Sequence, residues 1–266
     1  MNWKTECQAI KGILFDKDGT LLDFNQVWGA ASVQAAKALC EKRGIGNRQD
    51  QVLQALGIHN GTVDPEGPLA VEPYEGIAKV LDPVLRATEE PGQESTKEAL
   101  LNLSQEIQDL FYDETCVKRK EYPVLTDLRS LMEKLNGMGI QTGIVTTDDK
   151  RSTEHFLEAT GIADAISFLA VSGCGMPEKP DGAIIRLASQ KWDISKDQIA
   201  VVGDTPNDMR FAANGGAKAI AVLSGTGQKN DLENLADVVL DSVADLPEYL
   251  AESSEWKRNK MVRNHE

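Results

Sequence analysis

The sequence has little of what marks nucleic-acid-binding or membrane proteins. Its 266 residues hold 28 Lys and Arg against 42 Asp and Glu, so positive charge is scarce. Binding a phosphate backbone needs clustered Lys and Arg. The only basic cluster is in the tail, at Lys257, Arg258, Lys260 and Arg263, where a solvated helix end or frayed terminus explains it. No apolar run approaches the roughly 18 residues of a membrane span. We therefore expect neither a nucleic-acid partner nor a membrane location.

Cysteine is also sparse. Cys7, Cys40, Cys116 and Cys174 are widely scattered, with no CxxC pair and no His at metal-binding spacing. This pattern predicts free thiols in a reducing compartment. Residues 1–11 lack the hydrophobic stretch of a signal peptide. We therefore expect a cytoplasmic protein.

The second half of the chain alternates short apolar runs with segments of helical periodicity. The runs lack polar alternation, which indicates strands buried on both faces. They are Ile140–Thr146, Ile166–Val171, Ile199–Val202 and Ala219–Val222, and Gly12–Asp16 near the start has the same pattern. Repeated strand–helix units of this kind predict an α/β fold, a doubly wound (Rossmann-like) parallel sheet with helices on both faces.

About a hundred residues of different character follow the first strand. Residues 25–44 and 98–116 are helical in period, whereas residues 57–97 are rich in Gly, Pro and Glu and contain no evident β run. We therefore expect a helical insertion over 24–122 and an α/β core made of 1–23 and 123–266.

Polar side chains follow three of the predicted strands. The first strand ends in Asp16-Lys17-Asp18, the second in Thr146-Thr147, and a later one in Asp204, with Asp208 four residues on. Asp and Thr are also common turn and cap residues, which explains any single instance. In an open parallel sheet, however, the carboxyl ends of the strands meet at the ligand-binding edge. Converging carboxylates with no Cys or His nearby favour a hard cation, and Mg²⁺ over Zn²⁺.

Asp16 and Asp18 are two residues apart, so in an extended chain they face the same side. One can then act as a nucleophile and the other as an acid and base on the same substrate. Lys179, which follows the third strand, is the candidate for neutralising a transferring phosphoryl group. A lone Lys is ordinarily a surface residue. Together these residues suit phosphoryl transfer.

Four segments, in order, resemble the four motifs of the haloacid dehalogenase superfamily. They are Asp16–Thr20 (DKDGT), Thr146 after its apolar run, Lys179-Pro180, and Gly203-Asp204 with Asp208. The segments FDKDGTLLDF and VGDTPNDM are most similar to its phosphoglycolate-phosphatase-type members. The helical insertion over 24–122 resembles the cap domain of that superfamily.

The resemblance implies a phosphatase that hydrolyses a small phosphorylated metabolite through an aspartyl-phosphate. Asp16 would be the nucleophile, and Asp18 would protonate the leaving alcohol and then activate water. Thr146 and Lys179 would bind the phosphoryl oxygens. Thr147 stands where many phosphatase relatives have Asn, and its hydroxyl can still donate to phosphate. The implied Mg²⁺ ligands are Asp16, Asp18 through its backbone carbonyl, Asp204 and Asp208.

Two alternatives stay open at this point. A phosphosugar mutase of the β-phosphoglucomutase type uses the same pair of aspartates, and no residue of the sequence separates it from a phosphatase. A non-catalytic member that binds a partner or effector would have lost Asp16, Asp18 or Asp204, and all three are present. The oligomeric state and the cap residues that set specificity are not visible in the sequence.

Overall fold

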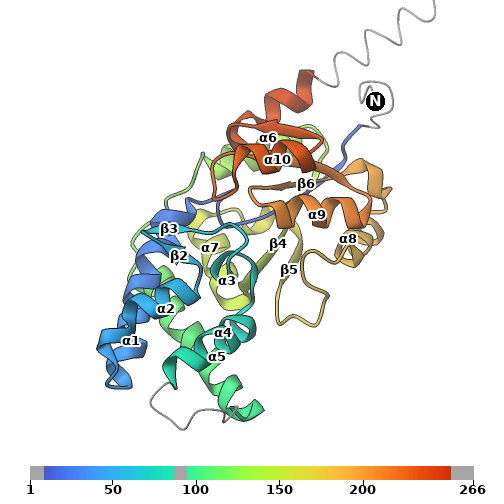
Figure 1. The fold of residues 1–266 in the computed structure, drawn as a ribbon. Coiled ribbons are helices and arrows are strands. Elements are labelled where there is room, and N and C mark those ends of the chain that lie inside the picture. The colour runs from blue at the N-terminus through green and yellow to red at the C-terminus, as the bar shows by residue number, and fades with distance from the viewer. Residues whose placement is uncertain (1–8, 87–94, 253–266) are drawn as a thin grey trace, which may run out of the picture.

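The computed structural model describes residues 9–86 and 95–252, and Figure 1 shows their arrangement. Cys7 and the basic tail discussed above lie outside these ranges. Within them, no helix is both long and apolar enough to cross a membrane. Cys40, Cys116 and Cys174 are free thiols.

The centre of the molecule is a parallel six-stranded sheet in the order β5-β4-β1-β6-β7-β8. The strands are β1 (Gly12–Phe15), β4 (Gln141–Asp149), β5 (Ile166–Ser172), β6 (Ile199–Gly203), β7 (Lys218–Val222) and β8 (Val238–Leu240). The five predicted strands are confirmed. Strand β8 was not predicted, because its three half-buried residues are too few to show a pattern.

Helices cover both faces of this sheet, which confirms the doubly wound fold. They are α6 (Leu128–Gly137), α7 (Lys150–Thr160), α8 (Ala183–Trp192), α9 (Pro206–Gly215) and α10 (Lys229–Leu235). In β1, Ile13 and Phe15 pack in the apolar cluster that includes α6 and α7. Leu14, between them, packs in the cluster that includes α8, α9 and α10. Alternate residues of one strand thus supply two cores, as the period of two in a β-strand requires.

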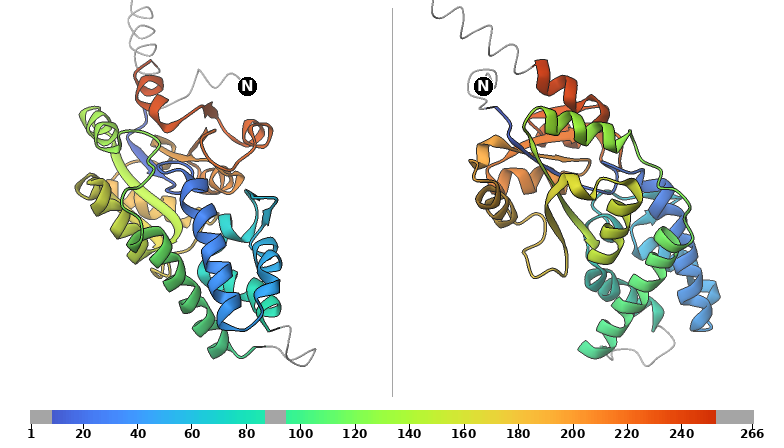
Figure 2. Two further views of the ribbon diagram at one scale, coloured as in Figure 1. Left: turned by 90° about the vertical axis from the view of Figure 1, so that its left-hand side faces the viewer. Right: turned by 180° about the vertical axis from the view of Figure 1, so that it is seen from behind.

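Residues 24–122, between β1 and α6, form a largely helical layer that we call the cap region. Figures 1 and 2 show its helices gathered at one end of the molecule. They are α1 (Ala30–Lys42), α2 (Gln49–Ala55), α3 (Pro68–Val71), α4 (Tyr74–Leu85) and α5 (Lys97–Tyr112), with single π-helical turns at Asn25–Gly29 and Asp113–Val117. The apolar cluster under α6 and α7 continues into this layer through Leu39, Leu81 and Ile107. The cap region is therefore packed directly on the sheet domain.

The expectation that residues 57–97 contain no β run was wrong. Strands β2 (Ile58–His59) and β3 (Thr62–Val63) form an antiparallel hairpin. Its turn is Asn60-Gly61, with φ of 52° and 79°. Asn-Gly is the strongest short signal for a hairpin turn that needs two positive φ angles. The signal was present in the sequence, but strands of two residues have no periodicity to accompany it.

Candidate active site

Asp16 and Asp204 lie at the carboxyl ends of the two central strands, β1 and β6. Asp16 follows β1 directly, and its backbone N–H donates to the Val202 carbonyl of β6 at 2.8 Å. Asp204 is fully buried, and its carboxylate accepts from the Thr20 hydroxyl at 3.2 Å and from the Thr226 N–H at 2.8 Å. The register of the sheet therefore brings these two predicted residues to one edge.

Two glycines make room for the Asp204 carboxylate. Gly19 has φ of 91°, and a side chain at either Gly19 or Gly225 would collide with the carboxylate of Asp204. Gly227 also packs against Asp204, because a side chain there would collide with the Asp204 backbone carbonyl. The turn after β1 and the loop after β7 enclose this side chain, because only glycine allows so close an approach.

Asp208 takes part both in the cap of helix α9 and in the site. Helix α9 begins with Thr205 as its N-cap, and one oxygen of Asp208 accepts from the Thr205 N–H at 3.1 Å and hydroxyl at 2.6 Å. Together with the Thr205 hydroxyl, which accepts from the Asp208 N–H, these contacts form a capping box. The other oxygen, Oδ1, accepts from Lys179 at 2.8 Å. The cap bonds fix the carboxylate so that its second oxygen faces the site.

Lys179 joins Asp16, which follows β1, to Asp208 in helix α9. Its Nζ lies 2.5 Å from Asp16 Oδ1 and 2.8 Å from Asp208 Oδ1, and its side chain is 5% exposed. Burial lowers the pKa of Lys179, but the carboxylates of Asp16 and Asp208 outweigh burial and raise it above its usual value. Lys179 therefore carries its positive charge beside the carboxylates of Asp16 and Asp208.

The carboxylates remain under-compensated despite this lysine. Burial raises the pKa of Asp16 well above its ordinary value, and Asp208 and Asp204 raise it further against the opposing effect of Lys179. Burial and the Asp208 charge raise the pKa of Asp204 to about 7. Asp16, Asp204 and Asp208 can each place a carboxylate oxygen within 4.8 Å of the others. A set of oxygen ligands with an excess of negative charge fits a divalent hard cation such as Mg²⁺.

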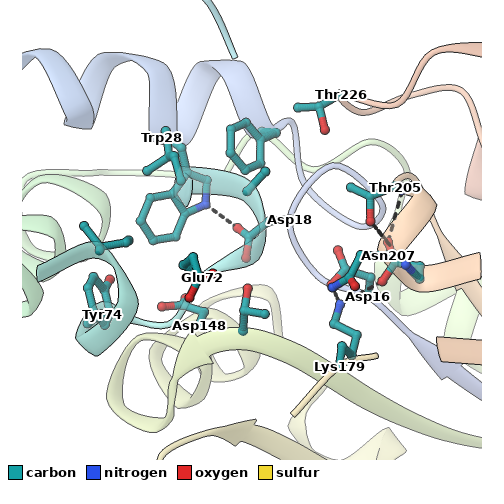
Figure 3. A pocket seen from close by; sticks show the side chains of 16 residues that line it. Asp16, Asp18, Trp28, Glu72, Tyr74, Asp148, Lys179, Thr205, Asn207 and Thr226 are labelled. Atoms are coloured by element: carbon teal, nitrogen blue, oxygen red, sulfur yellow. Dashed lines mark hydrogen bonds and ion pairs between the residues drawn. The ribbon is translucent and has the colours of Figure 1, made fainter. Parts of the chain in front are cut away.

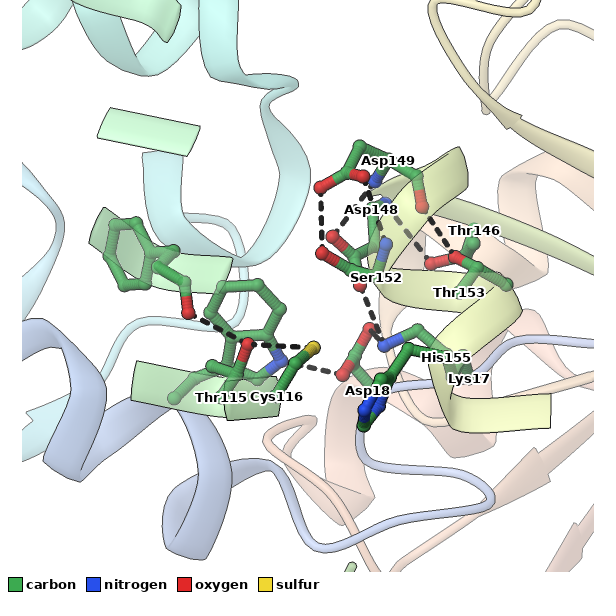
Figure 4. A network of polar contacts seen from close by, with 12 residues as sticks. Lys17, Asp18, Thr115, Cys116, Thr146, Asp148, Asp149, Ser152, Thr153 and His155 are labelled. Atoms are coloured by element: carbon green, nitrogen blue, oxygen red, sulfur yellow. Dashed lines mark hydrogen bonds and ion pairs between the residues drawn. The ribbon is translucent and has the colours of Figure 1, made fainter. Parts of the chain in front are cut away.

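The side chain of Asp18 points away from these three carboxylates. The Trp28 indole N–H donates to Asp18 Oδ1 at 2.5 Å, and Lys17 Nζ lies 2.7 Å from Asp18 Oδ2 (Figure 4). Both oxygens of Asp18 are thus held by donors, one from the cap region and one from its own loop. A metal contact through the backbone carbonyl of Asp18 stays a prediction.

Sequence reasoning missed Lys17 and Asp148. Lys17 has a side chain only 4% exposed, and its Nζ lies 2.9 Å from Asp148 Oδ2 as well as against Asp18. Of the two aspartates that precede α7, Asp149 is the one that caps the helix, since its carboxylate accepts from the Ser152 N–H at 3.0 Å. Burial raises the pKa of Asp148 to about 7 although Lys17 opposes the shift.

The two predicted threonines lie at different depths. Thr147 lines the pocket that contains Asp16, Asp18 and Lys179. Thr146 is buried and does not line that pocket, and its hydroxyl accepts from the Asp148 N–H at 3.1 Å. In this structure the second strand therefore presents Thr147 at the pocket wall and uses Thr146 to support the turn behind it.

The cap region supplies the opposite wall of the pocket (Figure 3). Trp28 packs on Phe111 with ring centroids 5.3 Å apart, and it also lines the pocket. The same side chain therefore belongs both to the core of the cap region and to the pocket wall. Further cap residues on this wall are Phe24, Leu69, Ala70, Glu72, Tyr74 and Ile77. The two histidines in the described ranges do not line it: His59 lies in β2, and His155 in α7 is bonded to the Tyr122 hydroxyl at 2.8 Å.

Known proteins similar to this chain carry the names of different phosphatases. The chain is 27% identical to a phosphoglycolate phosphatase of Vibrio cholerae over 93% of its own length and 100% of that protein. It is 24% identical to a putative pyrophosphatase of Clostridium perfringens, over 80% of this chain and 84% of that one. A solved structure of a predicted phosphoglycolate phosphatase from Haemophilus somnus superposes with a TM-score of 0.69 at 18% identity, covering 92% of this chain and 99% of the other.

The family assignment rests on a match over most of the chain. The sequence profile of the haloacid dehalogenase-like hydrolases matches residues 10–216, a range that runs from the start of β1 to the end of α9 and includes every predicted site residue. This chain belongs to the haloacid dehalogenase-like hydrolases.

Proposed function

We propose that this protein is a Mg²⁺-dependent phosphatase that hydrolyses a small phosphomonoester, of the phosphoglycolate or sugar-phosphate type. The observation that carries the proposal is the meeting of Asp16, Lys179 and the carboxylates of Asp204 and Asp208 at one edge of the sheet. A nucleophile, a fixed ammonium and an oxygen-only cation site are the parts that phosphoryl transfer requires. The activity of the Vibrio cholerae relative supports the same class of reaction.

Asp16 is the proposed nucleophile. A carboxylate oxygen of Asp16 attacks phosphorus, the bond between phosphorus and the ester oxygen breaks, and the phosphoryl group is carried on Asp16. Water then attacks the aspartyl-phosphate, which releases inorganic phosphate and restores the carboxylate. Lys179, 2.5 Å from Asp16 Oδ1, holds that oxygen in place and offsets charge on the transferring group.

Asp18 is the proposed acid and base. It would give a proton to the leaving alkoxide as the ester bond breaks and take one from the attacking water in the second half-reaction. Trp28 and Lys17 position its carboxylate at 2.5 and 2.7 Å. Because Trp28 belongs to the cap region, movement of the cap would move a contact of the acid.

The residues around the nucleophile also fit the other proposed roles. Asp16, Asp204 and Asp208, with the backbone carbonyl of Asp18, would hold Mg²⁺, and a bound Mg²⁺ supplies charge shielding between phosphate and carboxylate. Thr147 on the pocket wall would bind a phosphoryl oxygen, whereas Thr146, predicted for the same role, would support the turn behind that wall. We further propose that 24–122 acts as a cap domain over a catalytic core of 1–23 and 123–266.

The test is phosphate release from a panel of phosphomonoesters with Mg²⁺ and with EDTA. We expect release that requires Mg²⁺ and disappears in Asp16→Asn, whereas Asp50→Asn, at an exposed position of α2, behaves as wild type. A mutase would return the phosphoryl group to a sugar hydroxyl and release little phosphate. Absence of release from every ester by folded protein would refute the phosphatase proposal.

A further inference from the structure

The pocket wall contributed by the cap region is poor in positive charge. Among the described residues that line the pocket, five carry carboxylates and one carries an ammonium group. The acids are Asp16, Asp18, Glu72, Asp148 and Asp208, and the base is Lys179. Lys179 is already in contact with Asp16 and Asp208, so its charge serves the phosphoryl end. A second anionic group on the substrate would find no cation on this wall.

Lys17 directly follows Asp16 in the sequence, but it does not change the balance of charge in the pocket. Its ammonium group lies between Asp18 and Asp148, at 2.7 and 2.9 Å, and does not line the pocket. The rings of Trp28 and Phe156 cover it, with centroids 5.8 and 5.7 Å from Nζ. It therefore compensates two carboxylates of the protein and is screened from the substrate by them.

Tyr74 brings an unused hydrogen-bonding group to the same wall. The residue is 7% exposed, lines the pocket, and its hydroxyl has no hydrogen-bond partner. Its ring packs on Phe111 with centroids 6.1 Å apart, which fixes the hydroxyl in place. Burial raises the pKa of Tyr74 well above its usual value, and the charges of Asp148, Asp149 and Asp18 add to the effect. The hydroxyl therefore stays a donor in a negative environment.

Glu72 complements this donor. It is an exposed residue on the cap side of the pocket, two positions before Tyr74, and its carboxylate packs against Gly76 in the first turn of α4. Figure 3 shows Glu72, Tyr74 and Trp28 on one side of the pocket and Lys179, Asp16 and Thr205 on the other. A carboxylate only accepts, whereas the Tyr74 hydroxyl is free to donate. A substrate hydroxyl, which both accepts and donates, matches this pair.

We propose that the pocket selects a phosphomonoester whose leaving group is uncharged and carries a hydroxyl, and that it discriminates against a leaving group with a carboxylate. This inference rests on the proposed phosphatase activity and narrows its substrate class to polyol or sugar phosphates. It predicts that phosphoglycolate, the substrate named for several relatives, is a poor substrate here. A substrate carboxylate would be desolvated beside Glu72 and Asp148 without a counter-charge, which costs binding.

The test compares esters that differ only at this group. Ethylene glycol monophosphate and phosphoglycolate form one matched pair, and glucitol phosphate and phosphogluconate form a longer one, with nitrophenyl phosphate as a general reporter of turnover. We expect kcat/KM to be higher for the hydroxyl member in both pairs, and higher by about tenfold or more in at least one of them. A tenfold ratio corresponds to a difference of about 1.4 kcal/mol. Equal or higher kcat/KM for the carboxylate member of either pair would overturn the inference. Turnover of none of the esters, nitrophenyl phosphate included, would instead refute the phosphatase proposal itself.

Two variants connect the preference to the residues. Glu72→Gln should narrow the hydroxyl-to-carboxylate ratio of kcat/KM by about fivefold. Glu75→Gln, exposed in the first turn of α4 and outside the pocket, should keep the wild-type ratio. Tyr74→Phe should raise KM for the hydroxyl ester by about fivefold through loss of one hydrogen bond. Circular dichroism and melting temperature establish that each variant is folded. A ratio unchanged in Glu72→Gln, with KM unchanged in Tyr74→Phe, would show that these side chains do not set the specificity.

Discussion

The two walls of the pocket are built in different ways. On the sheet side, Asp16 and Lys179 follow strands β1 and β5 and are fixed by backbone register and short polar contacts. On the cap side, Trp28 and Tyr74 are held mainly by an aromatic cluster around Phe111. The sheet wall contributes most of the charged groups of the pocket. The cap wall contributes aromatic surface and single hydrogen-bond donors.

This difference separates the chemistry from its selection. Residues that a phosphoryl-transfer step needs are concentrated where parallel strands end, because the sheet brings those ends together regardless of the loops. The cap wall touches the same space mainly with aromatic and apolar side chains, and it supplies none of the three carboxylates of Asp16, Asp204 and Asp208. The following variants are ways to break or sharpen that contrast, in order of decreasing effect.

Replacement of Asp16, the proposed nucleophile, should abolish activity and leave the fold intact. Asp16→Asn removes the attacking oxygen, and we expect kcat to fall by at least about ten-thousandfold. Since burial raises the pKa of Asp16, a neutral side chain of the same shape is tolerated there, and the free energy of unfolding should stay the same or rise. Steady-state kinetics and urea denaturation measure both. Strong destabilisation would mean that Asp16 holds the sheet edge together.

Removal of Mg²⁺ should cost about a thousandfold in rate and make stability depend on pH. The pKa of Asp204 is raised to about 7 in the folded protein, so protonation stabilises the metal-free fold at low pH, and that stabilisation is lost as the pH rises through about 7. We expect Mg²⁺ to raise the melting temperature more at about pH 8 than at about pH 5.5.

Asp204→Asn serves as the control for the metal effect. It should abolish most of the Mg²⁺-dependent rise in melting temperature at either pH. Asp148, with its pKa raised to about 7, adds a pH dependence of the same sign that Mg²⁺ leaves in place, so some decline with pH should persist in the variant. An equal Mg²⁺ effect in wild type and Asp204→Asn would contradict the assignment of the ligand.

Breaking the buried ion pair beneath the site should destabilise the protein by about 3 kcal/mol, because an unpaired charge is left in the interior. Lys17→Met does this, and urea denaturation measures it. The double variant Lys17→Met with Asp148→Asn should recover part of the loss. Lys37→Met removes an exposed pair with Glu41, with the lysine side chain 57% exposed, and should change stability little. Equal effects of the two lysine variants would show that the buried pair is not structural.

The smallest expected effect comes from the cap contact to Asp18. Trp28→Phe keeps an aromatic ring against Phe111 but removes the N–H that donates to Asp18 at 2.5 Å. We expect kcat to fall about tenfold, with KM nearly unchanged, because the acid is less well positioned. Trp192→Phe removes an indole N–H bonded to Ser167, away from the pocket, and should leave kcat at its wild-type value. A similar loss in both variants would point to a general packing effect.

The sequence by itself determined the sheet and the residues that follow its strands. Continuous apolar runs report burial on both faces of a parallel sheet, and a polar residue that ends such a run must lie at the sheet edge. Asp16, Asp204 and Asp208 were therefore predictable, as were Asp18 and Lys179 as candidates. The shortest strands, β2, β3 and β8, were not predicted because two or three residues cannot show a hydrophobic period.

Only the tertiary structure decided how Asp18 is held and what the cap presents to the substrate. The contacts of Lys17 with Asp148 and of Tyr74 with Phe111 join residues from distant segments. Hydrophobic periodicity specifies which face of a helix is buried, but it carries no information on which partner that face meets. Which partner it meets depends on how the cap region packs on the sheet. The sequence could therefore predict Asp16 as the candidate nucleophile, but it could not predict which side chains form the cap wall of the pocket.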